Sequence, residues 1–283
     1  MADDGAVLVV GGDSALGGRV AARLSAGGVM VISTSRRGTP EAWPLNLAAE
    51  TSSWKLPSGV ATAVFAAAMT STETCRRQPT DARRVNVEAP VAIAKGLVSR
   101  GTRVVFLSTN LVFDGSIPHT PASAPPCPRT AYGKMKAEAE EALLNLGELV
   151  TVIRLTKVFD AAAPLVAGWR SSLRRGEPVR PLTDMLLAPV SPEFAAEAIA
   201  AVILTPVPGI LQVSAAADIS YAAVATRLAE AWGFSSDLVR PVTVAGSGLD
   251  FEHVPLHTTL DAMRMESLFG IASPDPFEAV GGG

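Results

Sequence analysis

Cysteine and histidine are scarce in this chain, which restricts the disulfides and metal sites it can build. Cys75 and Cys127 are its only cysteines. Two are too few for a disulfide framework and are typical of a reducing compartment, so we expect the protein in the cytoplasm. Among three histidines, His253 and His257 lie four residues apart, but Pro255 between them argues against a helix that presents both. We therefore expect no metal site.

Charge and long apolar runs are also in short supply. Charged residues make up 18% of the chain and the net charge is −3, without a long basic run, so we do not expect nucleic acid as a partner. No apolar stretch reaches the roughly 18 residues of a membrane helix. The opening MADDGAVLVVGG has two acids and no basic region, unlike a secretory signal. We expect neither a membrane span nor a leader.

Short apolar runs, in contrast, alternate regularly with helix-like segments. The strand-like runs are 6–10, 29–34, 61–68, 103–109, 149–155 and 210–214. Helices are expected over 14–28, about 80–100, around Tyr132, 191–204 and 220–233. Continuous apolar strands between helices indicate a parallel sheet that is covered on both faces. We predict a doubly wound, Rossmann-type α/β fold, whose ligands bind beyond the carboxyl ends of the strands.

The later part of the chain has more prolines and a less regular alternation. We therefore assign 1–160 to a dinucleotide-binding domain. Residues 161–283 are expected to form a small substrate-binding lobe that is interleaved with the end of the sheet.

A glycine-rich loop, VVGGDSALGGRV, joins the first strand to the first helix. Gly11 permits a tight turn, Gly17 permits close packing of the helix, and the helix amides then face a pyrophosphate. A turn without a ligand is the alternative, but the position straight after the first strand favours a dinucleotide site. Ser14 stands where regular spacing would place a glycine, and its side chain either narrows the approach of the phosphates or binds one. Ala15 and Leu16 complete the candidate loop.

The end of the second strand reads STSRRG and has no acid to hold a ribose 2′-hydroxyl. Ser35, Arg36 and Arg37 occupy that place, and the arginines can pair with a 2′-phosphate. Two solvated loop arginines are the alternative. We expect NADP, with NAD less favoured, as the cofactor.

Several stretches line up in order with a known family: GGDSALG, FAAAMTSTETCRRQP, RVNVEAPVAIAK, VVFLSTNLVFDG, YGKMKAEAE, VIRLTKVFD and TTLDAMRMESLFGI. Together they resemble an extended short-chain dehydrogenase/reductase, most closely the dTDP-4-dehydrorhamnose reductase group, over nearly the whole chain. The resemblance implies a hydride-transfer site with Thr109, Tyr132 and Lys136 as its triad and Ser108 beside it. Tyr132 would protonate the carbonyl oxygen and Thr109 would hydrogen-bond it, while Lys136 lowers the tyrosine pKa and holds the nicotinamide ribose.

By spacing alone, Tyr132 and Lys136 could equally be neighbours on an exposed helix face. Their position after a strand-end Ser-Thr and a proline-rich loop favours the catalytic interpretation. The resemblance also implies that Ala66, Ala67 and Ala68 line the cofactor. Asn86 matches an asparagine that is as easily structural as functional.

The resemblance places Arg154, with Val158, on the strand that leads toward the substrate, but nearby residues depart from the group. Asn110 and Leu111 replace Asp-Tyr, and Lys157 replaces an aromatic residue near the sugar. We take Asn110, Arg154 and Lys157 as candidate substrate-binding residues. Four arginines either hold a substrate diphosphate or form a solvated helix face: Arg170, Arg174, Arg175 and Arg180.

The resemblance implies an NADP-dependent reductase acting on a nucleotide sugar, in the first place a dTDP-4-keto-6-deoxyhexose. An epimerase or reductase for another nucleotide sugar would keep the same triad. A third hypothesis is a non-catalytic, cofactor-binding regulatory subunit, as in the methionine adenosyltransferase relative of this group. A homodimer is expected by analogy with the superfamily.

Overall fold

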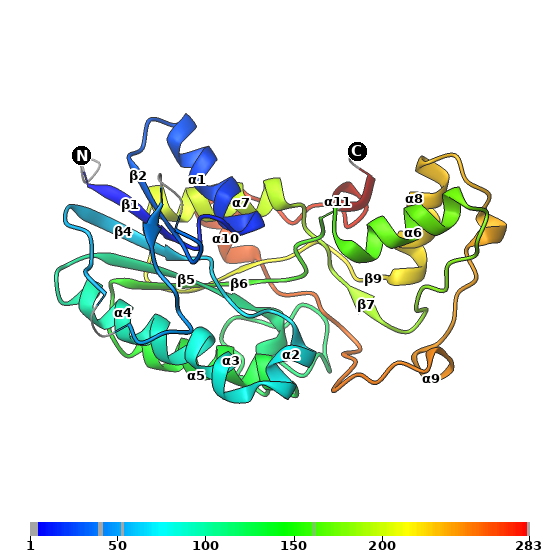
Figure 1. Ribbon diagram of the computed structural model, residues 1–283, viewed down its shortest axis with the longest axis horizontal. Coiled ribbons are helices and arrows are strands. Elements are labelled where there is room, and N and C mark those ends of the chain that lie inside the picture. Colours follow the sequence, from blue (N-terminus) through cyan, green and yellow to red (C-terminus); the bar gives the residue numbers. More distant parts are fainter. Residues whose placement is uncertain (1–4, 39–41, 52–53, 161, 282–283) are drawn as a thin grey trace.

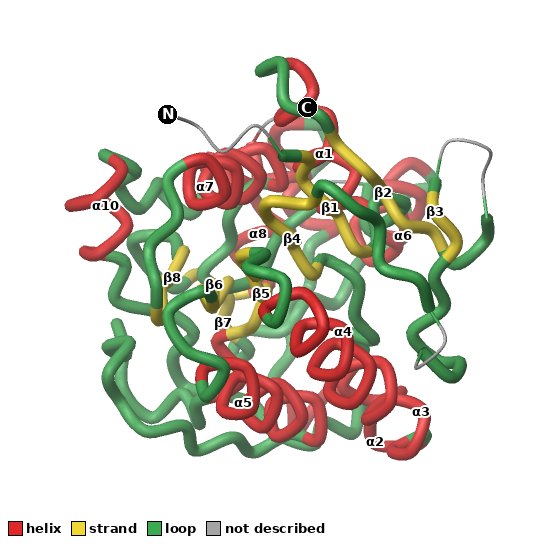
Figure 2. Tube along the Cα trace, turned by 90° about the vertical axis from the view of Figure 1, so that its left-hand side faces the viewer, coloured by secondary structure: helices red, strands yellow, loops and turns green. Residues whose placement is uncertain are grey.

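A parallel sheet with strand order β3-β2-β1-β4-β5-β6-β8 forms the centre of the structure (Figures 1 and 2). The structure is a computed structural model that describes residues 5–38, 42–51, 54–160 and 162–281. The strands of this central sheet are β1 Ala6–Val10, β2 Val31–Ser35, β3 Trp43–Pro44, β4 Val60–Phe65, β5 Arg103–Thr109, β6 Val150–Leu155 and β8 Gly209–Val213. The strand order reverses direction between β1 and β4, so the predicted doubly wound fold is confirmed.

Helices cover both faces of this sheet (Figure 2). On one face lie α1 Ala15–Ala26, α7 Pro192–Leu204 and α10 Met263–Phe269, and on the other α4 Ala89–Val98 and α5 Ala131–Leu144. The first face buries Leu24 and Ile199 against Val105. The second buries Leu97 and Leu143 against other residues of the same strands. Because both faces are covered, the central strands are apolar throughout instead of alternating.

Local chemistry explains two departures from the expected element bounds. The strand expected over 61–68 ends at Phe65, because the amides of Ala66 and Ala67 both turn to the carbonyl of Val10. The helix expected near 80–100 is preceded by α2 Thr72–Arg77 and divides into α3 Pro79–Arg83, the π-helical turn η1 Arg84–Glu88 and α4. Pro90 has no N–H and its ring would collide with the carbonyl four residues earlier, which accounts for the widened turn.

A smaller lobe lies beyond the carboxyl ends of the strands, at the right of Figure 1. Its elements are α6 Pro164–Arg174, β7 Leu186–Leu187, β9 Ile219–Ser220, α8 Tyr221–Ala231, η3 Ser236–Leu238, α9 Val244–Ser247 and α11 Glu278–Gly281. Trp169 and Leu228 belong to its separate apolar core. The intervening α7 and β8 return to the sheet, so this part of the chain contributes to both bodies. Within the described ranges, no helix is both long and apolar enough to cross a membrane.

A buried ion pair fixes α5 against the sheet. Arg154 on β6 and Glu140 on α5 are 1% and 2% exposed, and Nη2 of Arg154 lies 2.7 Å from Oε2 of Glu140. The guanidinium Nε is 3.1 Å from both carboxylate oxygens, while Nη1 donates to the Ala122 carbonyl at 3.1 Å. The guanidinium carbon Cζ of Arg154 lies 4.8 Å from the ring centre of Phe113. One side chain therefore joins β6, α5 and the loop that precedes α5.

We expect Arg154→Met to lower the free energy of unfolding by about 3–5 kcal/mol, because it leaves Glu140 buried without its partner. Adding Glu140→Leu should recover most of this loss, since a well-packed apolar pair removes the stranded charge. Urea unfolding of both variants measures the difference.

The matched control is Arg83, which pairs with Glu138 on the exposed side of the same helix. Arg83→Met should change stability by no more than about 1 kcal/mol, because solvent screens that pair. If the double variant were as unstable as Arg154→Met alone, the stranded Glu140 charge would not be the cause.

Candidate active site

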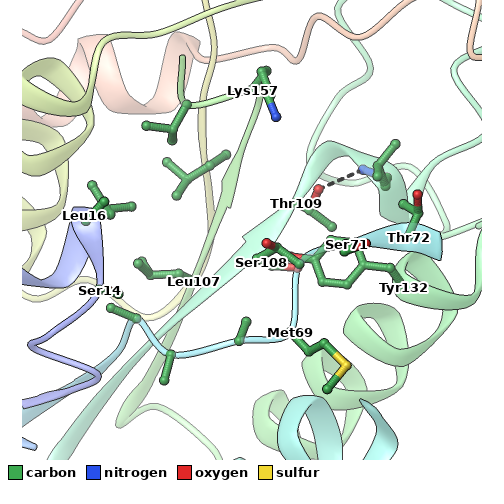
Figure 3. Close-up of a pocket in the computed structure, with 18 of the residues that line it drawn as sticks. Ser14, Leu16, Met69, Ser71, Thr72, Leu107, Ser108, Thr109, Tyr132 and Lys157 are labelled. Carbon is green, nitrogen blue, oxygen red and sulfur yellow. Dashed lines mark hydrogen bonds between the residues drawn. The ribbon is translucent and has the colours of Figure 1, made fainter. Parts of the chain in front are cut away.

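A cleft of about 1040 Å³ opens at the carboxyl ends of the strands, where the sheet meets the lobe. Figure 3 shows side chains from the glycine loop, from β5 and from α5 gathered around it. Of the predicted site residues, those that line it are Gly11, Ser14, Ala15, Leu16, Arg36, Arg37, Ala66, Ala67, Ala68, Ser108, Thr109, Asn110, Tyr132 and Lys157. Gly17, Ser35, Lys136 and Arg154 are not among the lining residues.

The glycine loop is compressed against its neighbours. Gly11 has φ +88°, and a Cβ there would lie 2.6 Å from the Cβ of Ala67. A Cβ on Gly17 would lie 2.2 Å from the carbonyl oxygen of Gly11. Both positions therefore require glycine, one for its backbone conformation and both for space. The predicted roles of these glycines, a tight turn and close helix packing, agree with this geometry.

Ser14 is the N-cap of α1. Its hydroxyl donates to the Gly11 carbonyl at 2.8 Å and accepts from the Gly17 amide at 3.0 Å. These two hydrogen bonds occupy the hydroxyl, which joins the loop to the first turn of the helix. The amides of Ala15 and Leu16 are in the first turn, where no intrahelical acceptor exists, and both residues line the cleft. This helix start fits the pyrophosphate of a dinucleotide.

One cleft residue beside the end of β2, Asp13 of the glycine loop, is missed by sequence reasoning. Arg36 and Arg37 are exposed and line the cleft as predicted. Ser35 is buried, and its hydroxyl donates to Oδ2 of Asp13 at 2.9 Å and accepts from the Arg37 amide at 3.1 Å. Asp13 also lines the cleft. The sequence motif predicts an acid only at the end of β2, whereas this acid comes from the glycine loop, directly after the Gly-Gly pair.

Asn86 holds the segment that follows β4. Its Oδ1 accepts from the Met69 amide and its Nδ2 donates to the Met69 carbonyl, both at 2.9 Å. The buried Cys75 thiol donates to the same carbonyl at 3.3 Å, and burial raises its pKa. Asn86 therefore positions the backbone that lines the cleft and does not line the cleft itself.

Tyr132 lies in the first turn of α5, which Thr130 caps through the Gly133 amide at 3.0 Å. The tyrosine packs against the buried Cys75 and is 7% exposed. Burial, with a smaller contribution from Cys75, raises its pKa above the ordinary value. The phenol is therefore protonated at neutral pH and can act as a proton donor.

Lys136 follows Tyr132 by one turn but points elsewhere. Its ammonium lies 3.6 Å from the ring centre of Phe106. Burial lowers the pKa of Lys136 to about 7, against the opposing influence of Glu140. The structure thus places the predicted pair on one helix and on one side of the sheet, with only the tyrosine in the cleft.

The predicted substrate residues divide between the cleft and the core. Asn110 and Lys157 line the cleft, and Figure 3 shows Lys157 on the side opposite Met69. Desolvation by the surrounding protein lowers the pKa of the Lys157 ammonium, although the residue remains exposed to solvent. Arg154 does not reach the cleft, because Glu140 and the loop carbonyl occupy its guanidinium.

The arginine cluster of the lobe also lies outside the cleft. None of its members is a lining residue: Arg170, Arg174, Arg175 and Arg180. The guanidinium carbon of Arg170 lies over the ring of Trp232, 5.2 Å from its centre. Nη2 of Arg175 pairs with Oε2 of Glu177 at 2.6 Å. These contacts favour the alternative of a structural and solvated helix face over a diphosphate site.

Two buried hydroxyls in the cleft have no hydrogen-bond partner in the described chain. Ser108 is 5% exposed and Thr156 is 4% exposed, and they stand at the ends of the neighbouring strands β5 and β6. An unpaired buried hydroxyl costs about 1–3 kcal/mol. Bound ligand can satisfy both groups, so these hydroxyls fit a polar occupant. Thr109, in contrast, accepts from the Leu111 amide at 3.2 Å.

Comparisons with known proteins identify the family of this chain. A family model described as RmlD substrate binding domain matches residues 5–281. The methionine adenosyltransferase 2 subunit beta of Xenopus tropicalis is 34% identical over 82 residues, which is 29% of this chain and 25% of that protein. A probable dTDP-4,6-dihydroxy-2-methyloxan-3-one 4-ketoreductase of Streptomyces antibioticus is 37% identical over 94 residues, or 32% of each chain. The matched segments thus span about a quarter to a third of these relatives.

Solved structures share the fold over nearly the full length. The crystal structure of the dTDP-4-dehydrorhamnose reductase of Bacillus anthracis, determined in complex with NADP, superposes with a TM-score of 0.82. The two sequences are 18% identical, and the match covers 98% of this chain and 96% of that one.

We expect Thr156→Val to leave the free energy of unfolding unchanged or to raise it, because the hydroxyl it removes has no partner. Thermal unfolding of the purified variant measures this. The control is Thr151→Val on β6, the strand that Thr156 directly follows, where the buried hydroxyl donates to the Val207 carbonyl at 2.6 Å. That variant should lose about 1–3 kcal/mol. Equal losses in both variants would mean that Thr156 has a structural partner.

We expect Lys136→Met to be more stable than the wild type at pH 7, with an advantage that shrinks as the pH rises to about 10. Burial lowers the folded-state pKa of Lys136 to about 7, whereas in the unfolded chain its pKa is about 10.4. Between these values the unfolded wild type binds more protons, so its stability rises with pH, and the variant lacks this titration. Urea unfolding at several pH values measures the difference, and parallel profiles would contradict the shift.

Proposed function

This chain belongs to the RmlD substrate binding domain family, and we propose that it is an NADPH-dependent reductase that acts on the keto group of a nucleotide sugar. One observation carries the proposal: a single cleft holds both the free amides at the start of α1 and the protonated phenol of Tyr132. The first suits a dinucleotide and the second suits a carbonyl oxygen. The likeness to a keto-sugar reductase of Streptomyces antibioticus supports this class of substrate.

The cofactor would lie along the ends of β1, β2 and β4. Ala15 and Leu16 would hold the pyrophosphate with their amides, while Ala66–Ala68 form a small-residue wall that allows close approach. Arg36 and Arg37 would pair with the 2′-phosphate. The NADP complex of the similar reductase from Bacillus anthracis supports NADP as the cofactor.

Bound NADPH supplies a hydride to the carbonyl carbon. Tyr132 donates its proton to the oxygen, which as an alkoxide is a stronger base than the phenolate left behind. Thr109 donates its hydroxyl hydrogen to the same oxygen. Its present contact with Oδ1 of Asn110 is long, at 3.4 Å, so the hydroxyl can turn to the substrate at small cost. Lys136, one turn along α5, favours the phenolate when its ammonium is charged.

Asn110 and Lys157 are the residues we propose to contact the sugar. Both line the same cleft as the proton donor. In the described chain Lys157 makes no ion pair, so its ammonium is available to an acceptor oxygen of the substrate. A dTDP-4-keto-6-deoxyhexose is the substrate that we would test first.

A second candidate function is a non-catalytic, cofactor-binding subunit. The 34% identity with a methionine adenosyltransferase subunit over 82 residues favours it. So does the position of Lys136 over Phe106, outside the cleft. Such a subunit would bind the dinucleotide without needing a proton donor.

We expect Tyr132→Phe to lower turnover of a keto-sugar nucleotide by about 10²–10⁴-fold, the usual contribution of a positioned proton donor, and to leave NADPH affinity unchanged. Turnover follows from NADPH absorbance and affinity from NADPH fluorescence.

Tyr221→Phe is the matched control, because Tyr221 is the other of the two tyrosines and also lines the cleft. It should keep nearly full turnover. If Tyr132→Phe remained as active as this control, the assigned proton donor would be wrong. A wild type that binds NADPH but reduces no keto-sugar nucleotide would favour the non-catalytic subunit.

A further inference from the structure

An acid stands beside the proposed 2′-phosphate site, although β2 itself ends without one. Asp13 comes from the glycine loop, and its Oδ2 accepts a hydrogen bond of 2.9 Å from the hydroxyl of Ser35, the last residue of β2. The same hydroxyl accepts from the Arg37 amide at 3.1 Å. Ser35 is 1% exposed, so packing holds its hydroxyl in place. The Asp13 carboxylate is therefore tethered where an acid at the end of β2 would otherwise act.

The Asp13 carboxylate retains capacity for a ligand. Among the described residues it accepts only the hydrogen bond from Ser35, and no ion pair joins it to Arg36 or Arg37. An ionised carboxylate can accept several hydrogen bonds. Asp13 is exposed, and it lines the same cleft as both arginines.

We propose that Asp13 sets the cofactor preference of this site by accepting a hydrogen bond from the ribose 2′-hydroxyl of NADH and by repelling the 2′-phosphate of NADPH. This inference rests on the proposed dinucleotide function. In dinucleotide folds an acid near this ribose favours NAD and an arginine favours NADP. Here the acid comes from the glycine loop and the arginines follow β2, so both influences act on one ribose. The wild type uses both cofactors, with an NADPH preference weaker than Arg36 and Arg37 alone would give.

A structural role for Asp13 makes a different prediction. If the carboxylate served only to fix the loop through Ser35, its loss would disturb the pyrophosphate site, which NADH and NADPH share. The two affinities would then fall together. A specificity role instead changes the ratio of the two dissociation constants.

The experiment is a fluorescence titration of wild type and Asp13→Asn with NADH and with NADPH. Asparagine keeps an oxygen that can accept from Ser35 and removes the charge. We expect NADPH to bind more tightly and NADH more weakly, so that their ratio of dissociation constants shifts by about tenfold, as for the loss of one like-charge contact. Asp160→Asn is the control, since Asp160 lines the cleft beside Arg19 at 3.6 Å and should leave the ratio unchanged.

An unchanged ratio in Asp13→Asn, or equal losses for both cofactors, would overturn the specificity role and leave the proposed function intact. An equal shift in Asp160→Asn would also overturn it, by reducing the effect to general charge. A wild type that binds neither NADH nor NADPH would overturn the proposed function and this inference with it.

Discussion

The buried ion pair between Arg154 and Glu140 determines where the catalytic side of the cleft lies. Glu140 is eight residues after Tyr132 on the same helix, about two turns away. The pair fixes α5 to β6 at 2.7 Å and fixes the preceding loop through Ala122. The direction of the Tyr132 phenol thus depends on two side chains that do not line the cleft. An ion pair this deep is costly to break, which suits a helix that must not shift.

The same burial governs the chemistry of the helix. It raises the pKa of Tyr132 and lowers that of Lys136 to about 7. The neutral phenol of Tyr132 therefore faces the cleft, while Lys136, which loses its proton more easily than a free lysine, lies over Phe106. In the same cleft, the buried hydroxyls of Ser108 and Thr156 have no hydrogen-bond partner in the described chain. Two of the three buried side-chain polar atoms without a partner in the described chain thus lie in the cleft, and the third, Oε1 of Gln212, lies outside it. A bound ligand can satisfy the two in the cleft, which is how a binding site differs from a well-packed core.

Features with a local cause could be predicted from the sequence. The apolar strands gave the fold, and the Gly11 turn and Tyr132 both lie where the motifs placed them. Side-chain direction depends on distant partners and was harder to predict. Arg154 is on the strand expected to lead to the substrate, but it turns inward because Glu140 lies opposite. Asp13 reaches β2 only because Ser35 holds it, a contact across 22 residues that no spacing rule reveals.

The most direct test of hydride transfer in this cleft uses NADPH that carries deuterium at C4 of the nicotinamide ring. Both C4 positions of the cofactor carry deuterium, so the transferred hydride is labelled whichever face of the ring it leaves. The protein is incubated with this cofactor and a dTDP-4-keto-6-deoxyhexose, and the product is analysed by mass spectrometry and NMR. A reductase built on Tyr132 should place one deuterium on the carbon that carried the keto group. Sugar recovered without deuterium, from protein that has bound both ligands, would contradict the reductase function and would indicate a cofactor-binding subunit instead.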